Sequence, residues 1–107
     1  MSQKHILIAD DSSAIRKTLR PFLEREDNWI VVGEAKNGKE AVQKAQMLKP
    51  DLVILDFAMP LMNGLQTVLE LKRISPSLPL ILFTNFASLH LEEIALSSGV
   101  NAVGFKI

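Results

Sequence analysis

Cysteine is missing from all 107 residues of the chain. Disulfide bonds and thiolate metal sites are therefore excluded, and the composition fits a protein of the reducing cytoplasm. Long apolar runs are missing too, since no stretch approaches the roughly 18 apolar residues of a membrane-spanning helix. After His5 only four apolar residues precede two acidic ones, too few for the core of a signal peptide. These absences predict a cytoplasmic location and no membrane partner.

An excess of charge of one sign is also missing. The 12 Lys and Arg residues balance the 12 Asp and Glu residues, giving a formal net charge of +0. The chain therefore lacks the global basic field that drives binding to nucleic acid, and we expect no DNA binding by this chain itself. A length of 107 residues with 48% hydrophobic residues predicts one domain with one core.

Short apolar runs that end at polar residues alternate with amphipathic segments. The runs predict strands at residues 6–9, 30–35, 51–56, 80–84 and 102–106. Between them, helices are expected to start after Ser12, Asn37 and Asn63, and a fourth is marked by Leu89, Ile94 and Ala95.

The helical segments carry two further expectations. Pro21 predicts a kink or an early stop in the first helix, because proline lacks the N–H that the helix needs. Phe22 is expected to share the apolar face of that helix, and Leu69 is expected near the core in the third helix.

Strands that alternate with helices require right-handed crossovers and a parallel sheet that is covered on both faces. Five such strands predict a doubly wound α/β fold with the strand order 2-1-3-4-5, the order found in flavodoxin/CheY-like proteins.

Polar residues follow four of the predicted strands: Asp10 and Asp11, then Asp56, Thr84 and Lys106. In an open parallel sheet, ligands bind beyond the carboxyl ends of the strands, where the strand order reverses. Neighbouring strands are about 4.8 Å apart, so the acids of the first and third strands reach a common ion. Three carboxylates this close repel one another unless a hard cation lies among them, and the all-oxygen donor set favours Mg²⁺.

On these motifs the chain resembles a bacterial two-component receiver domain over nearly its whole length. The matching motifs, in order, are Asp10-Asp11, residues 50–56, Met59-Pro60 with Asn63-Gly64, Thr84, and Gly99 with Lys106 seven residues later. The amino-acid sequence of residues 31–35 and 37–41 is most similar to that of receivers of the NarL/LuxR type.

The resemblance implies that Asp56 accepts a phosphoryl group from a histidine kinase, a phosphotransfer protein or a small phosphodonor. It implies that Asp11 and Asp56 bind Mg²⁺ together with the backbone carbonyl of Ala58, while Asp10 helps through water. No enzymatic activity is implied beyond slow self-phosphorylation and self-dephosphorylation.

The resemblance also implies a switch. Thr84 would hydrogen-bond one phosphoryl oxygen and Lys106 would pair with another, which would move Thr84, the fifth strand and the fourth helix. The output expected for this receiver type is a helix-turn-helix domain that regulates transcription, so DNA would be reached only through a domain missing from this chain. A homodimer is compatible with the same resemblance.

The sequence departs from the usual receiver pattern at three places. Val103 stands where an aromatic residue is usual, Asn85 stands where a small one is usual, and Ile107 ends the chain before a fifth helix. We therefore expect residues 1–107 to form a receiver domain truncated after the fifth strand. The sheet face beside the first helix would then remain apolar and open, or be covered by a partner.

Two alternatives stay open. A stand-alone phosphorelay or chemotaxis-type receiver would share every motif and act by protein–protein interaction. An aspartyl-nucleophile phosphatase is less favoured, because such enzymes place a second acid two residues after the nucleophile, where this chain has Ala58.

Overall fold

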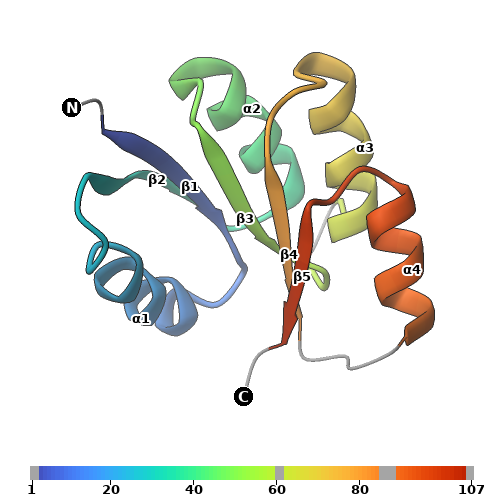
Figure 1. Ribbon diagram of the computed structural model, residues 1–107, viewed down its shortest axis with the longest axis horizontal. Coiled ribbons are helices and arrows are strands. Elements are labelled where there is room, and N and C mark those ends of the chain that lie inside the picture. Colours follow the sequence, from blue (N-terminus) through green and yellow to red (C-terminus); the bar gives the residue numbers. More distant parts are fainter. Residues whose placement is uncertain (1–2, 60–61, 85–88, 106–107) are drawn as a thin grey trace.

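The chain folds into a parallel five-stranded sheet with the strand order β2-β1-β3-β4-β5, as predicted. The computed structural model describes residues 3–59, 62–84 and 89–105. The strands are β1 (Lys4–Ala9), β2 (Trp29–Ala35), β3 (Leu52–Asp56), β4 (Leu80–Thr84) and β5 (Ala102–Phe105). The helices are α1 (Ser13–Leu23), α2 (Gly38–Leu48), α3 (Gly64–Ile74) and α4 (Leu89–Ser97). Figure 1 shows α1 on one side of the sheet and the other three helices on the opposite side.

The interior strands divide the core into two layers, because successive side chains along a strand point to opposite faces. Leu7 and Leu55 belong to the larger layer, which packs under α2, α3 and α4. Ile6 and Ile8 belong to the smaller layer on the side of α1. No helix among the described residues is long and apolar enough to cross a membrane.

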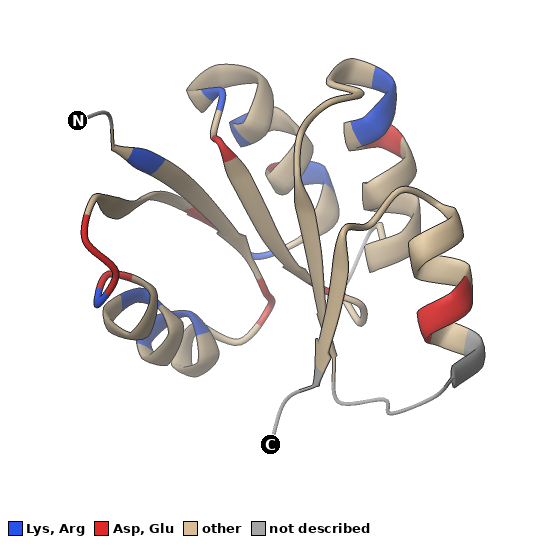
Figure 2. Ribbon diagram, viewed as in Figure 1, with Lys and Arg blue, Asp and Glu red and all other residues tan. Residues whose placement is uncertain are grey.

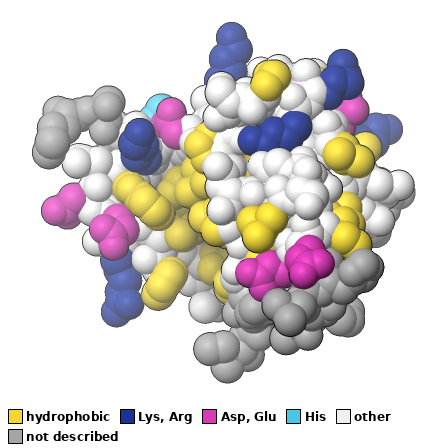
Figure 3. All heavy atoms as spheres, turned by 45° about the vertical axis from the view of Figure 1, so that its right-hand side comes forward, with side chains coloured by type: hydrophobic (Ala, Val, Ile, Leu, Met, Phe, Trp, Pro, Cys, Tyr) yellow, Lys and Arg dark blue, Asp and Glu magenta, His cyan; other side chains and the backbone are white. Residues whose placement is uncertain are grey.

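The face of the sheet on the α1 side is only partly covered. Ile81 and Phe83 of β4 and Leu52 of β3 are half-buried there and pack against the smaller core layer. A shallow hollow of about 230 Å³ lies on this face, with Trp29 and Leu52 among its lining residues. Figure 3 shows apolar side chains gathered in a hollow between two parts of the surface. This agrees with the expected open apolar face.

The helix starts are fixed by side-chain caps, as predicted. The side-chain oxygen of Asn37 accepts a hydrogen bond from the backbone N–H of Glu40 at 2.8 Å. Asn63 and Gln66 form a reciprocal capping box, with distances of 2.9 and 3.0 Å. Each cap satisfies backbone donors that the first helical turn leaves without partners.

The stop expected at Pro21 does not occur there, since α1 continues to Leu23. Pro21 lies in the last turn and is exposed, so its missing N–H costs one hydrogen bond just before the helix ends.

Two expected core positions are wrong. Leu69 is 59% exposed and Phe22 is 61% exposed. Residues 64, 67, 68 and 71 form the buried stripe of α3, and a helix turns by about 100° per residue, so position 69 points away from the sheet. At the end of α1, Leu23 is buried against the sheet, whereas Phe22 points into solvent.

Leu71 and Leu69 provide a matched test of this packing, because they lie on the same helix and differ in burial. We expect Leu71→Ala to lower the free energy of unfolding by about 2–5 kcal/mol, since it leaves a cavity under α3. Leu69→Ala is the control and should change it by about 0.5 kcal/mol or less. Urea unfolding followed by circular dichroism measures both. Equal losses in the two variants would contradict the assigned face of α3.

Candidate functional site

Three acids converge at the carboxyl end of the two central strands. Ala9 pairs with Leu55, so the next residues, Asp10 and Asp56, leave β1 and β3 side by side. One carboxylate oxygen from each of Asp10, Asp11 and Asp56 lies within 4.8 Å of the others. Figure 2 shows acidic residues in the loop between β1 and α1, at the lower end of the sheet in that view.

Burial differs among these acids. Asp10 and Asp56 are 2% and 6% exposed, whereas Asp11 is exposed at the rim. Two of the three carboxylates are withdrawn from water, and negative charges this close to one another repel. Their oxygen atoms match the ligands that a hard divalent cation prefers. The residues present therefore fit a Mg²⁺ ion.

The loop that follows Asp56 is held close to the start of α3. The backbone N–H of Gly64 donates to the carbonyl oxygen of Phe57 at 2.7 Å. A Cβ atom at position 64 would lie 2.6 Å from the Phe57 Cα and 2.7 Å from the Asp56 carbonyl oxygen, closer than real contacts allow. Only glycine permits this approach, which fixes the backbone around Asp56.

The remaining predicted site residues occupy different surroundings. Thr84 ends β4 and is fully buried, one residue beyond Phe83, the neighbour of Asp56 in the sheet. Ala58 is exposed two residues after Asp56. Lys106, like the departures Asn85 and Ile107, lies outside the described residues. Val103 is half-buried on β5 and pairs with Leu82.

A charge cluster that the sequence analysis did not assign lies beside the acids. Glu34 on β2 accepts from Arg16 Nε at 2.9 Å and from Arg20 Nη2 at 2.8 Å. The hydrogen bond from Arg20 is the largest influence on the pKa of the Glu34 carboxyl and lowers it, desolvation opposes this, and Arg16 lowers the pKa further. The available sequence signal was the four-residue spacing of the two arginines, which places both on one face of α1.

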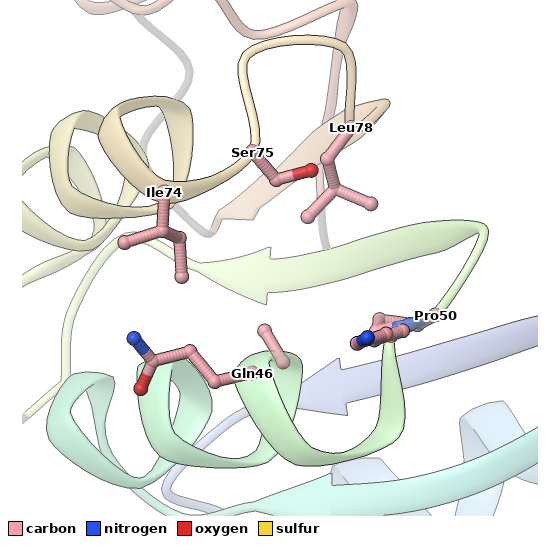
Figure 4. Close-up of a pocket in the computed structure, with 7 residues that line it drawn as sticks. Gln46, Pro50, Ile74, Ser75 and Leu78 are labelled. Carbon is pink, nitrogen blue, oxygen red and sulfur yellow. The ribbon is translucent and has the colours of Figure 1, made fainter.

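A separate hollow of about 370 Å³ lies between the carboxyl ends of α2 and α3. Figure 4 shows Gln46 and Ile74 pointing toward each other across it, with Pro50 and Leu78 at its other side. Pro50 precedes β3 and Asp56 ends it, so the hollow is at the opposite end of the strand from the acids. The acid cluster, not this hollow, matches the binding edge of a doubly wound sheet.

Removing one acid should relieve the repulsion within the cluster. We expect Asp11→Asn to raise the thermal midpoint measured without divalent cations by about 4 °C, corresponding to about 1 kcal/mol. The further rise on adding Mg²⁺ should be smaller than in the wild type, because one cation ligand is lost. Asp27→Asn, an exposed acid between α1 and β2, is the control. A lower midpoint for Asp11→Asn without cations would contradict the repulsion.

The Glu34 ion pairs make stability depend on pH. Because the folded-state pKa of Glu34 lies below its ordinary value of 4.5, the unfolded chain binds the proton more readily. The ion pairs therefore contribute fully above pH 4.5, and the contribution disappears as the pH falls through the folded-state pKa. Urea unfolding should show that the wild type has a higher free energy of unfolding than Glu34→Gln above pH 4.5, and that this difference shrinks as the pH falls below 4.5. A difference that stays constant with pH would contradict the assignment.

Comparison with known proteins identifies one family over nearly the whole chain. The family model described as response regulator receiver domain covers residues 6–106. Protein-glutamate methylesterase/protein-glutamine glutaminase 1 of Syntrophomonas wolfei subsp. wolfei is 34% identical over 105 residues, which are 98% of this chain and 30% of that protein. The transcriptional regulatory protein YdfI of Bacillus subtilis is 37% identical over 86 residues, 80% of this chain and 40% of that protein.

A solved structure supports the fold. The crystal structure of a LuxR-family two-component response regulator from Aurantimonas sp. matches with a TM-score of 0.94 at 24% identity, over 98% of this chain and 75% of that one. This chain spans less than half the length of the two curated relatives just described. By the match over residues 6–106 and the identity to these relatives, the chain belongs to the family of response regulator receiver domains of two-component systems.

Proposed function

We propose that this receiver domain accepts a phosphoryl group on Asp56 in a Mg²⁺-dependent reaction. The observation that carries the proposal is the meeting of Asp10, Asp11 and Asp56, with one oxygen of each within 4.8 Å of the others. This is an acidic oxygen site at the binding edge of the sheet.

Asp56 is the proposed nucleophile. One of its carboxylate oxygens forms a bond to phosphorus as the bond between phosphorus and the donor's leaving group breaks, so the phosphoryl group passes to the carboxylate. Bound Mg²⁺ would supply positive charge that offsets the charge on the transferring oxygens. The position of Asp56 at the end of a buried strand holds its backbone still during the transfer.

The other acids are proposed as cation ligands. Asp11 and Asp56 would bind Mg²⁺ directly with the backbone carbonyl of Ala58, and Asp10 would act through water. The exposure of Asp11 supports its direct role, because an ion that enters from solvent meets this carboxylate before the two buried ones.

Thr84 and Lys106 are proposed to report the modification. The Thr84 hydroxyl would donate to a phosphoryl oxygen and the Lys106 ammonium would pair with another, drawing the carboxyl ends of β4 and β5 toward Asp56. The sheet order supports the role of Thr84, since β4 is the direct neighbour of β3. The consequence would be a changed surface at β5 and α4.

The proposed phosphoryl donor is a histidine kinase or a phosphotransfer protein. We also propose that the receiver controls a helix-turn-helix output domain that regulates transcription. The NarL/LuxR-type sequence of residues 31–35 and 37–41 and the similarity to YdfI support this proposal. The second candidate is a stand-alone phosphorelay or chemotaxis-type receiver that acts by protein–protein interaction, and the similarity to the methylesterase relative supports its chemotaxis form. Because the net charge of residues 1–107 is +0, they lack the excess of positive charge that DNA binding needs. If DNA is the target, we propose that an output domain outside these residues binds it.

Intact mass after incubation with Mg²⁺ and acetyl phosphate tests the phosphoacceptor. We expect the wild type to gain one phosphoryl group and Asp56→Asn to gain none, because the amide is not a usable nucleophile. The linkage should be labile in both acid and base, as an acyl phosphate is.

Asp51→Asn provides the matched control, because Asp51 precedes the same strand at its amino end and accepts from the backbone N–H of His5. This variant should take up phosphoryl as the wild type does. Uptake that persists in folded Asp56→Asn would move the nucleophile to another residue and refute the proposal.

A further inference from the structure

The peptide that joins Asp10 to Asp11 is anchored on three sides. Its first residue donates from the backbone N–H to the Ala35 carbonyl at 2.9 Å. The Asp10 carboxylate accepts from the backbone N–H of Ser12 at 2.9 Å. The Asp10 carbonyl oxygen, which belongs to the peptide plane itself, accepts a hydrogen bond from Arg16 Nη1. The first two bonds hold Asp10, and the third fixes the plane from which Asp11 projects.

Arg16 has a second anchor on a different element. Its Nε donates to Glu34 Oε1 at 2.9 Å, and its side chain is only 15% exposed. Glu34 is followed on β2 by Ala35, and the carbonyl oxygen of Ala35 accepts the hydrogen bond from the Asp10 N–H. The guanidinium therefore ties the end of β2 to the backbone between two acids, and its planar fork suits this double contact.

Arg20 offers a natural contrast. It binds the same carboxylate, with Nη2 at 2.8 Å and Nε at 3.1 Å from Glu34 Oε2, and its side chain is 40% exposed. Its remaining hydrogen bond goes to the Val31 carbonyl at 3.2 Å, away from the acidic loop. Figure 2 shows both kinds of charge here, with basic residues along α1 and acidic residues in the loop before it.

We propose that Arg16 is a positioning residue for the cation site, which it serves by fixing the peptide plane between Asp10 and Asp11. The inference rests on the proposed function, in that Mg²⁺ is the ion to be bound. Asp11 is exposed and would otherwise sample many orientations at the rim. A ligand held in place before binding loses less conformational freedom when the ion arrives.

The direction in which the Mg²⁺ affinity changes when Arg16 is replaced distinguishes a positioning role from a purely electrostatic one. Arg16 carries a positive charge near the acids, which by Coulomb repulsion disfavours a cation. Removing that charge alone would tighten Mg²⁺ binding. Releasing the peptide plane would weaken it, by about tenfold or more if Arg16 behaves as outer-shell groups of metal sites do.

Calorimetric titration of the chain with Mg²⁺ distinguishes the two effects. We expect Arg16→Ala to weaken Mg²⁺ binding about tenfold. Arg20→Ala removes the same charge from the same helix and the same Glu34, and should leave the affinity within about twofold. Thermal unfolding without Mg²⁺ shows how much each variant loses in fold stability, so a general loss of structure is not mistaken for a loss of the site.

Arg16→Lys is the second variant, because it keeps the charge and loses the fork. It should also bind Mg²⁺ more weakly than the wild type. Unchanged or tighter binding in both Arg16 variants, or equal weakening in Arg20→Ala, would overturn the role of Arg16 while leaving the proposed function intact. A folded wild-type chain that binds no Mg²⁺ would instead contradict the proposed function, and the role of Arg16 with it.

Discussion

Repulsion among three carboxylates at one edge of the sheet is the constraint on which the rest of this structure depends. Two of the acids are buried, and one oxygen of each of the three lies within 4.8 Å of the others, so desolvation and like-charge repulsion act on the same small group of side chains. The strands that carry them are deeply buried, with Leu7 and Leu55 fully enclosed. Apolar burial in the centre of the sheet thus offsets an unfavourable cluster at its edge.

The backbone around the acids is held by contacts from three elements. Position 64 packs against the loop after Asp56 with no room for a side chain, and β2 holds the N–H of Asp10 through Ala35. Arg16 on α1 donates to the carbonyl oxygen of Asp10, in the loop after β1. The acids are therefore set by the sheet and its adjoining helices, while the exposed carboxylate of Asp11 remains accessible to solvent.

Much of this arrangement follows from local sequence. The apolar runs mark the strands, the Asn caps mark the starts of α2 and α3, and the polar residues after each run mark the binding edge. The faces of Leu69 and Phe22 were not predictable in the same way, because a helix with apolar residues on several sides is oriented by its tertiary neighbours. The contact from Arg16 to a backbone carbonyl was hidden for a further reason, since long polar side chains have many partners within reach.

The pairing of β1 with β3 has a consequence for how this sequence tolerates length changes. Side chains along a strand alternate between faces, so one residue inserted between Leu52 and Val53 would turn Asp56 to the opposite side and exchange Val53 and Leu55 with Ile54 between core layers. Insertions in the turn between Ser75 and Pro79 would leave the pairing of Ala9 with Leu55 unchanged. A change of length is therefore expected to be tolerated in that turn, whereas the number of residues from Val53 to Asp56 is fixed by the need to keep Asp56 beside Asp10.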